Sequence, residues 1–287
     1  KSRSPRRRRR PPRKAVGPSP VLELGLGRLW YIEPSYLLCG VVEDHAPGLQ
    51  GCRQSAYPAR ALRQRRLLTM MSIQTVATKS FEGQKPGTSG LRKRVTVFEQ
   101  EHYTENFVQC ILSAIPGGAR GATLVVGGDG RYLSLPTVQK IVRLAAGNGV
   151  AKLIIGQNGI LSTPAASHVI RLRKATGGIL LTASHNPGGP NADFGIKYNV
   201  QNGGPAPEAV TNKIYELTTK IDHYFLQQGD DVDLSQVGAA SFGDLQIDVI
   251  DPIKDYVDYL ATIFDFDLIK SFLSSGQFLS LIHISEP

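Results

Sequence analysis

A serine with polar neighbours follows an apolar run near the middle of this sequence. Ser184 stands in Thr182-Ala183-Ser184-His185-Asn186-Pro187, directly after the run Gly178–Leu181. In open α/β sheets, reactive groups gather at the carboxyl ends of strands, and a serine hydroxyl becomes an effective nucleophile when a base or a cation lies beside it. The pattern indicates a nucleophilic serine at a strand end, although a turn in which Ser184 only caps backbone amides fits the same spacing.

Three further strings have the composition of anion-binding loops. Gly87–Arg92 combines small residues, which expose backbone N–H groups, with an arginine that can bind two phosphate oxygens. Gly127–Arg131 follows an apolar run, and Asn158–Pro164 leads into an expected helix N-terminus, where backbone amides attract anions. A common glycine-rich loop also explains the first string, a tight strand-to-helix turn is the favoured interpretation of the second, and helix capping alone explains Thr163 in the third. Taken singly, none of them identifies a phosphate site.

Alternating apolar patterns define the elements that would position these loops. Short β-rich runs predict strands, and apolar residues at helical spacing predict helices. The expected strands are 122–126, 152–155, 178–181 and 195–199, and the expected helices are 137–146, 164–174 with Thr163 as N-cap, 207–224, 252–264 and 267–273. Strands that alternate with helices at these lengths predict an α/β fold with a sheet covered by helices.

The formal net charge of +9 is concentrated near the N-terminus. Residues 1–70 hold 15 Lys/Arg and 4 Asp/Glu, a net charge of +11, whereas residues 71–287 hold 18 and 20, a net charge of −2. No nucleic-acid-binding surface is therefore expected on the main body. The run Arg6–Arg10 keeps nucleic-acid binding open as an alternative for the first 70 residues.

The cysteines and the hydropathy favour a cytoplasmic protein. Cys39, Cys52 and Cys110 are odd in number and lack metal-ligand spacing, so neither a disulfide framework nor a zinc site is expected. The main body has a single cysteine, which suits a reducing compartment. No run of 18 or more apolar residues occurs, and no membrane span is expected.

Composition divides the chain into four parts. Residues 1–70 are arginine- and proline-rich, without a sustained period, and are interpreted as a disordered or non-native leader, with Met71 as the start of the native protein. Residues 71–250 form the expected main domain, and residues 251–276 the opening of a second α/β domain. Residues 277–287 resemble the translation of a sequencing adaptor and are interpreted as an artefactual tail.

Six strings in one order resemble the first domain of eukaryotic phosphoglucomutases, members of the α-D-phosphohexomutase superfamily. They are P-G-T-S-G-L-R at 86–92, V-V-G-G-D-G-R at 125–131, G-Q-N-G-I-L-S-T-P at 156–164, T-A-S-H-N-P-G-G-P-N at 182–191, D-F-G-I-K-Y-N at 193–199 and N-G-G-P-A-P-E at 202–208. The resemblance covers about residues 73–272, and it implies that the sheet of the expected α/β fold is mixed.

The resemblance also implies a function for specific residues. Ser184 would carry a phosphoryl group and exchange it with glucose 1-phosphate or glucose 6-phosphate, through glucose 1,6-bisphosphate. Arg92 would contact phosphate, His185 would act beside the phosphoserine, and Lys197 would act as acid or base and bind phosphate. Mg²⁺ would be bound through the phosphate on Ser184. The family further implies a cytoplasmic monomer that acts on small sugar phosphates, without a nucleic-acid or membrane partner.

Several family motifs do not occur in this sequence. The D-G-D-G-D-R string, whose aspartates complete the Mg²⁺ site, the sugar-recognising G-E-E-S-F-G string and the carboxy-terminal phosphate-binding domain are absent from it. Mannose or glucosamine phosphate therefore remain alternative substrates. A catalytically weak, aciculin-like structural protein is a further alternative, although the retained Asn186 favours the active branch.

We expect the 287-residue chain by itself to show no mutase activity and only weak Mg²⁺ binding. Mg²⁺ prefers about six oxygen ligands in an octahedron, and Ser184 supplies one ligand without the aspartates. The measurement is a coupled assay with glucose 1-phosphate, catalytic glucose 1,6-bisphosphate and Mg²⁺. Turnover above background that disappears in Ser184→Ala would contradict this expectation.

Overall fold

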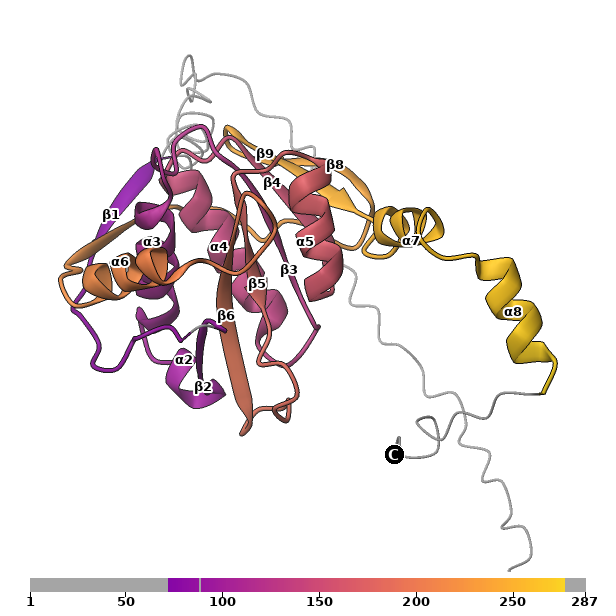
Figure 1. Ribbon diagram of the computed structural model, residues 1–287. Coiled ribbons are helices and arrows are strands. Elements are labelled where there is room, and N and C mark those ends of the chain that lie inside the picture. The colour runs from indigo at the N-terminus through magenta and orange to yellow at the C-terminus, as the bar shows by residue number, and fades with distance from the viewer. Residues whose placement is uncertain (1–71, 88, 277–287) are drawn as a thin grey trace, which may run out of the picture. The chain divides into compact units, whose positions relative to one another are not determined.

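The computed structural model describes residues 72–87 and 89–276 of the chain. Its strands are β1 Ile73–Ala77, β2 Leu91–Arg94, β3 Thr123–Gly128, β4 Lys152–Ile160, β5 Gly177–Leu181, β6 Asp193–Val200, β7 His223–Gln227, β8 Gly238–Phe242 and β9 Leu245–Ile250. Its helices are α2 Val95–Phe98, α3 Tyr103–Ala114, α4 Ser134–Gly147, α5 Thr163–Leu172, α6 Glu208–Thr218, α7 Lys254–Ala261 and α8 Phe266–Ser274 (Figure 1). The expected leader and tail lie outside the described residues.

Seven strands form one mixed sheet in the order β2-β6-β5-β3-β4-β9-β8. β3 runs parallel to β4 and β5, and β4 runs parallel to β9. The strands β2, β6 and β8 pair antiparallel with their neighbours. The parallel strands lie at the centre because their nearly continuous apolar runs are buried on both faces. The predicted α/β fold with a mixed sheet is thus confirmed.

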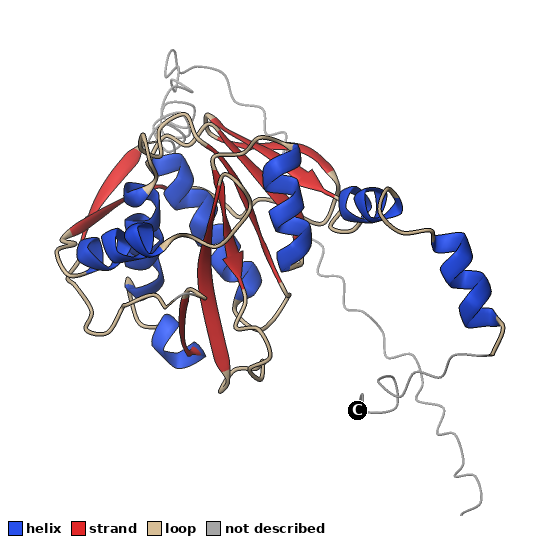
Figure 2. Ribbon diagram, viewed as in Figure 1, coloured by secondary structure: helices blue, strands red, loops and turns tan. Residues whose placement is uncertain are grey.

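Hydrophobic cores lie on both faces of this sheet. Successive residues of a strand point to opposite faces, so Leu124 and Val126 pack in the larger core, while Val125 packs in the smaller one. Helices α3 and α4 cover the larger core and α5 covers the smaller one (Figures 1 and 2). Each fully buried aliphatic side chain contributes about 1.5–3 kcal/mol, and burial on both faces therefore fixes the central strands.

Several sequence-based boundaries were wrong. The expected helix 207–224 ends at Thr218, because residues 223–227 form β7 and pair with β1, a strand not predicted. The polar stretch after residue 227 contains β8, and β9 and α3 were also missed. The N-cap of α5 is Ser162, whose hydroxyl oxygen accepts the Ala165 N–H at 3.3 Å, and not Thr163.

Helix α7 follows the sheet and contacts α5. Arg173 at the end of α5 forms an ion pair with Asp255 at 2.8 Å, and the rings of His168 and Tyr259 stack with centroids 4.4 Å apart. Neither α7 nor α8 buries a residue. No helix in residues 72–87 and 89–276 has both the length and the apolar character that crossing a membrane requires.

Cys110 is the single cysteine among the described residues. It lies in α3, where it is buried and forms no disulfide. Burial raises the pKa of its thiol to about 12. The thiol therefore stays protonated at neutral pH and packs as a small hydrophobic group, as the sequence suggested.

Gly147→Ala should destabilise the fold by about 1–3 kcal/mol, although alanine favours helices. Gly147 ends α4 against the backbone of β7, and a Cβ there would lie 2.5 Å from the Leu226 Cα. The measurement is the free energy of unfolding in denaturant. Gly188→Ala is the control, because its Cβ would meet only the Arg131 Cβ at 3.6 Å. An unchanged or increased stability of Gly147→Ala would contradict this packing argument.

Candidate active site

The carboxyl ends of β3 and β5 lie side by side. Gly128 pairs with Leu181 in the parallel register, and the next residue, Asp129, donates its N–H to the Leu181 carbonyl at 3.2 Å. Thr182 begins the segment 182–193, here called the serine loop, which connects β5 to β6. The structure therefore places Ser184 just beyond a strand end, where the sequence predicted it.

Ser184 has an unusual backbone conformation and an accessible side chain. Its φ is +59°, in the left-handed region that residues other than glycine seldom adopt. The preceding Ala183 is fully buried, whereas Ser184 is exposed. The Ser184 hydroxyl lies 3.4 Å from Nδ1 of His185. The capping role belongs to Thr182, whose hydroxyl oxygen accepts the Ser184 N–H at 3.0 Å. The Ser184 hydroxyl is consequently available for chemistry.

Arg92 and Lys197 lie on the neighbouring strands β2 and β6. Arg92 pairs with Gly195, whose absent side chain allows close approach, since a Cβ there would lie 2.3 Å from the Thr182 carbonyl oxygen. Thr182 in turn donates its N–H to the Gly195 carbonyl at 2.9 Å. The two basic residues and the start of the serine loop thus meet along one stretch of β6.

Lys197 has an environment that disfavours its charge. Burial, followed by the positive charge of Arg92, lowers the pKa of Lys197 below its ordinary value. The Nε of Arg92 is buried without a hydrogen-bond partner among the described residues. An oxyanion bound here would satisfy Arg92 and stabilise the charged form of Lys197. This pair can bind phosphate, and Lys197 can also exchange a proton.

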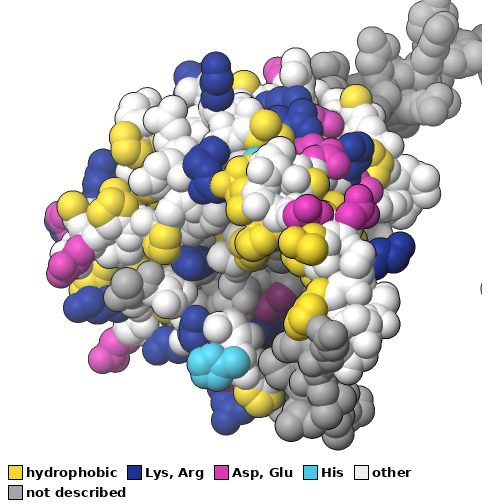
Figure 3. Space-filling model, turned by 45° about the vertical axis from the view of Figure 1, so that its right-hand side comes forward, with side chains coloured by type: hydrophobic (Ala, Val, Ile, Leu, Met, Phe, Trp, Pro, Cys, Tyr) yellow, Lys and Arg dark blue, Asp and Glu magenta, His cyan; other side chains and the backbone are white. Residues whose placement is uncertain are grey.

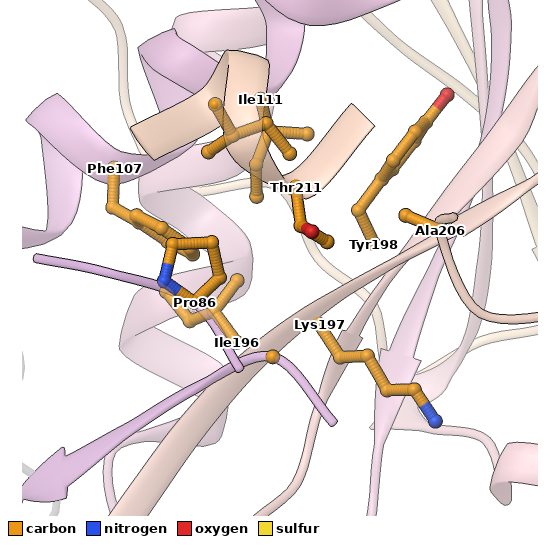
Figure 4. Close-up of a pocket in the computed structure, with 10 residues that line it drawn as sticks. Pro86, Phe107, Ile111, Ile196, Lys197, Tyr198, Ala206 and Thr211 are labelled. Carbon is orange, nitrogen blue, oxygen red and sulfur yellow. The ribbon is translucent and has the colours of Figure 1, made fainter. Parts of the chain in front are cut away.

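An apolar cavity beside Lys197 is too small for a sugar phosphate. It has a volume of about 10 Å³ and is lined mainly by apolar side chains, among them Phe107, Ile111 and Ile196. The Lys197 ammonium group points away from these side chains (Figure 4). Figure 3 shows a face of the molecule that is hollowed, with Lys and Arg side chains on one side of the hollow and hydrophobic side chains on the other. The open surface that carries Arg92 and Lys197 is a better candidate for substrate than the small cavity.

The Gly127–Arg131 string forms a turn and not a phosphate site. The Arg131 side chain is only 7% exposed, and its guanidinium forms an ion pair with Asp129 at 2.9 Å. Although burial raises the pKa of Asp129, hydrogen bonds from Arg131 and Thr182 hold it below its ordinary value. The sequence argument missed these three residues as a group, because it did not place β3 beside β5.

Metal ligands are scarce in the described part of the chain. Residues 72–87 and 89–276 contain no group of three or more His, Cys, Asp or Glu that could hold a metal ion. Asp129, which lies beside the serine loop, is already engaged by Arg131 and Thr182. These residues alone do not form a site for Mg²⁺.

Comparison with known proteins identifies the family. Residues 83–225 match the family description "Phosphoglucomutase/phosphomannomutase, alpha/beta/alpha domain I". A phosphoglucomutase of Aspergillus fumigatus is 62% identical over 207 residues, which are 72% of this chain and 37% of that protein. The chain belongs to the phosphoglucomutase/phosphomannomutase family.

Two further relatives match the same part of the chain. A pea protein named cytoplasmic phosphoglucomutase is 53% identical over 223 residues, covering 74% of this chain and 38% of its own length. The open form of parafusin, a phosphoglucomutase of Paramecium, has a TM-score of 0.68 at 41% identity, covering 72% of this chain and 39% of that one. The chain therefore spans a little over a third of the length of these relatives.

Lys197→Met should raise the melting temperature at pH 7 by roughly 1–3 °C, a small effect because the side chain is partly exposed. The unfolded chain holds the Lys197 proton more tightly than the folded one, so folding with a charged Lys197 costs stability. This advantage of the variant should shrink as the pH rises toward 10.5, the ordinary pKa. The control is Lys93→Met, at an exposed position of β2. A lower melting temperature for Lys197→Met would contradict the argument that a charged Lys197 destabilises the folded chain.

Proposed function

We propose that this domain acts, within a full-length enzyme, in the interconversion of glucose 1-phosphate and glucose 6-phosphate. The observation that carries the proposal is the exposed Ser184 hydroxyl at the end of β5, beside the basic pair on β2 and β6. Relatives of 53–62% identity that are named phosphoglucomutases support glucose as the sugar, in preference to mannose or glucosamine.

In this proposal Ser184 carries the phosphoryl group between sugar oxygens. The bond from phosphorus to the Ser184 oxygen breaks as a bond from phosphorus to a sugar hydroxyl oxygen forms, and the hydroxyl proton passes to a base. Glucose 1,6-bisphosphate results, and its other phosphate returns to Ser184. Phosphoryl transfer depends mainly on positioning and on charge stabilisation, and the roles of the surrounding residues follow from that requirement.

Arg92, Lys197 and His185 fulfil these requirements in different ways. Arg92 holds phosphate oxygens in a plane with its guanidinium. The lowered pKa of Lys197 brings its ammonium group closer to proton exchange near neutral pH, as acid–base catalysis requires. His185, 3.4 Å from the Ser184 hydroxyl, would exchange a proton with that oxygen.

Mg²⁺ enters the proposal through ligands that the described residues do not provide. A phosphorylated Ser184 would contribute one phosphate oxygen, and bound Mg²⁺ would offset the charge of about −1.5 to −2 on the phosphoserine. The other ligands would come from the remainder of a full-length enzyme. The name of the pea relative supports a cytoplasmic location.

Ser184→Ala should abolish both turnover and phosphoserine in a full-length graft. In this graft, the 207 matched residues of the chain replace their counterparts in the Aspergillus fumigatus phosphoglucomutase. Turnover of glucose 1-phosphate and intact-protein mass spectrometry are measured together. The control is Ser241→Ala, at an exposed position of β8.

Two results would count against the proposal. A folded graft that carries the wild-type Ser184 and does not turn over glucose 1-phosphate would contradict the activity. A stable phosphate on Ser162 or Ser89, in place of Ser184, would contradict the assignment of the phosphorylated residue.

A further inference from the structure

The Arg131 side chain is only 7% exposed, and its donors are all engaged. Its Nε lies 3.0 Å from both carboxylate oxygens of Asp129, and Nη2 lies 2.9 Å from one of them. Its Nη2 also donates to the Ser184 carbonyl at 3.1 Å, and Nη1 donates to the carbonyls of Asn186 at 3.4 Å and Asp193 at 2.8 Å. A side chain in this state has no donor left for a substrate phosphate.

The three carbonyls belong to the two ends of the serine loop. Ser184 and Asn186 lie near its beginning, and Asp193 is the first residue of β6. Asn186 adds a bond of its own, because its Nδ2 donates to the Asp193 carboxylate at 2.8 Å. One guanidinium therefore ties the end of β3 to the loop and to the start of the next strand.

Asp129 connects to the other side of the Ser184 backbone. Its carboxylate accepts the Thr182 hydroxyl proton at 2.7 Å, and the same hydroxyl oxygen accepts the Ser184 N–H at 3.0 Å. The N–H of Ser184 is thus held through Thr182, and its carbonyl is held by Arg131. Both backbone polar groups of Ser184, its N–H and its carbonyl, are therefore held by the ion pair between Asp129 and Arg131.

The backbone of Ser184 needs such restraint. For a residue other than glycine, a φ of +59° costs of order 1–3 kcal/mol. Such a conformation persists when several contacts from the surrounding structure hold it in place. Relaxation to a negative φ would turn the direction of the side chain. The ion pair is also close to neutral overall, so it adds little attraction for a phosphate dianion.

We propose that Arg131, oriented by Asp129, is a positioning residue that holds Ser184 in its left-handed conformation and so sets the direction of its hydroxyl oxygen. Thr182 transmits the same restraint to the Ser184 N–H. The inference rests on the proposed role of Ser184 as the phosphorylated residue. It assigns to the G-G-D-G-R turn a task that is distinct from binding phosphate.

Two pairs of variants separate positioning from general stability. Arg131→Lys keeps the charge but replaces the planar fork with a single ammonium group. Its matched control is Arg143→Lys, because Arg143 also holds a loop, through the Gly229 carbonyl and Asp231, away from the serine loop. Thr182→Val removes the hydroxyl without a large change of shape, and Thr182→Ser restores a hydroxyl.

The first measurement is hydrogen–deuterium exchange in the 287-residue chain. Peptides that span residues 182–193 should exchange faster in Arg131→Lys and Thr182→Val, while Thr182→Ser and Arg143→Lys should resemble the wild type. This readout needs no activity, so it tests the restraint even if the proposed function is wrong. Unchanged exchange of the serine loop in both Arg131→Lys and Thr182→Val would overturn the restraint.

The second measurement is steady-state kinetics in the full-length graft. A displaced reacting oxygen should lower kcat by about 10- to 100-fold in Arg131→Lys and Thr182→Val. The KM for glucose 1-phosphate should change by less than about threefold, and Thr182→Ser should recover most of kcat.

The outcomes distinguish the inference from its premise. A raised KM at constant kcat would show that Arg131 binds substrate, and wild-type kcat in both variants would show that the loop needs no such restraint. Either result would overturn the positioning role. An inactive wild-type graft would instead contradict the proposed function, while the exchange result would still stand.

Discussion

The register between β3 and β5 is the constraint on which the site depends. Gly128 faces Leu181 in that register, and a Cβ at Gly128 would lie 2.1 Å from the Leu181 carbonyl oxygen. The two strands can end together because position 128 has no side chain. Asp129 and Thr182 follow directly, and their side chains meet at 2.7 Å. The serine loop begins at Thr182, in this contact, so the pairing of two buried strands fixes where the loop starts.

The site retains features that cost stability. Ser184 has a left-handed backbone, Lys197 is partly desolvated beside another cation, and the Nε of Arg92 is buried without a partner among the described residues. Local rules are commonly broken at functional sites and compensated elsewhere. Here the compensation comes from apolar cores on both faces of the sheet. A rigid support can hold a strained loop, because the central strands cannot shift without exposing apolar surface.

Two arginines near the serine loop differ in role because they differ in partners. Arg131 has a carboxylate and three carbonyls as acceptors, and it therefore acts on the protein backbone. Arg92 lies beside Lys197 and forms no ion pair among the described residues. A bound anion would give its buried Nε a hydrogen-bond acceptor. Residue type alone does not distinguish a structural cation from a binding one. The distinction comes from which acceptors the fold places within reach.

The sequence by itself determined the strands β3, β4, β5 and β6, the helices α4 and α5 and the position of Ser184 after β5, because apolar runs and glycine-rich turns are local signals of burial and chain reversal. It did not determine β1, β7 and β8, since these strands are partly exposed and depend on partners that are distant in sequence. The connection from Asp129 through Thr182 and Arg131 to Ser184 joins residues about 53 positions apart. Only the tertiary structure decided it, because strand order arises from packing across the whole sheet and leaves no local pattern in the chain.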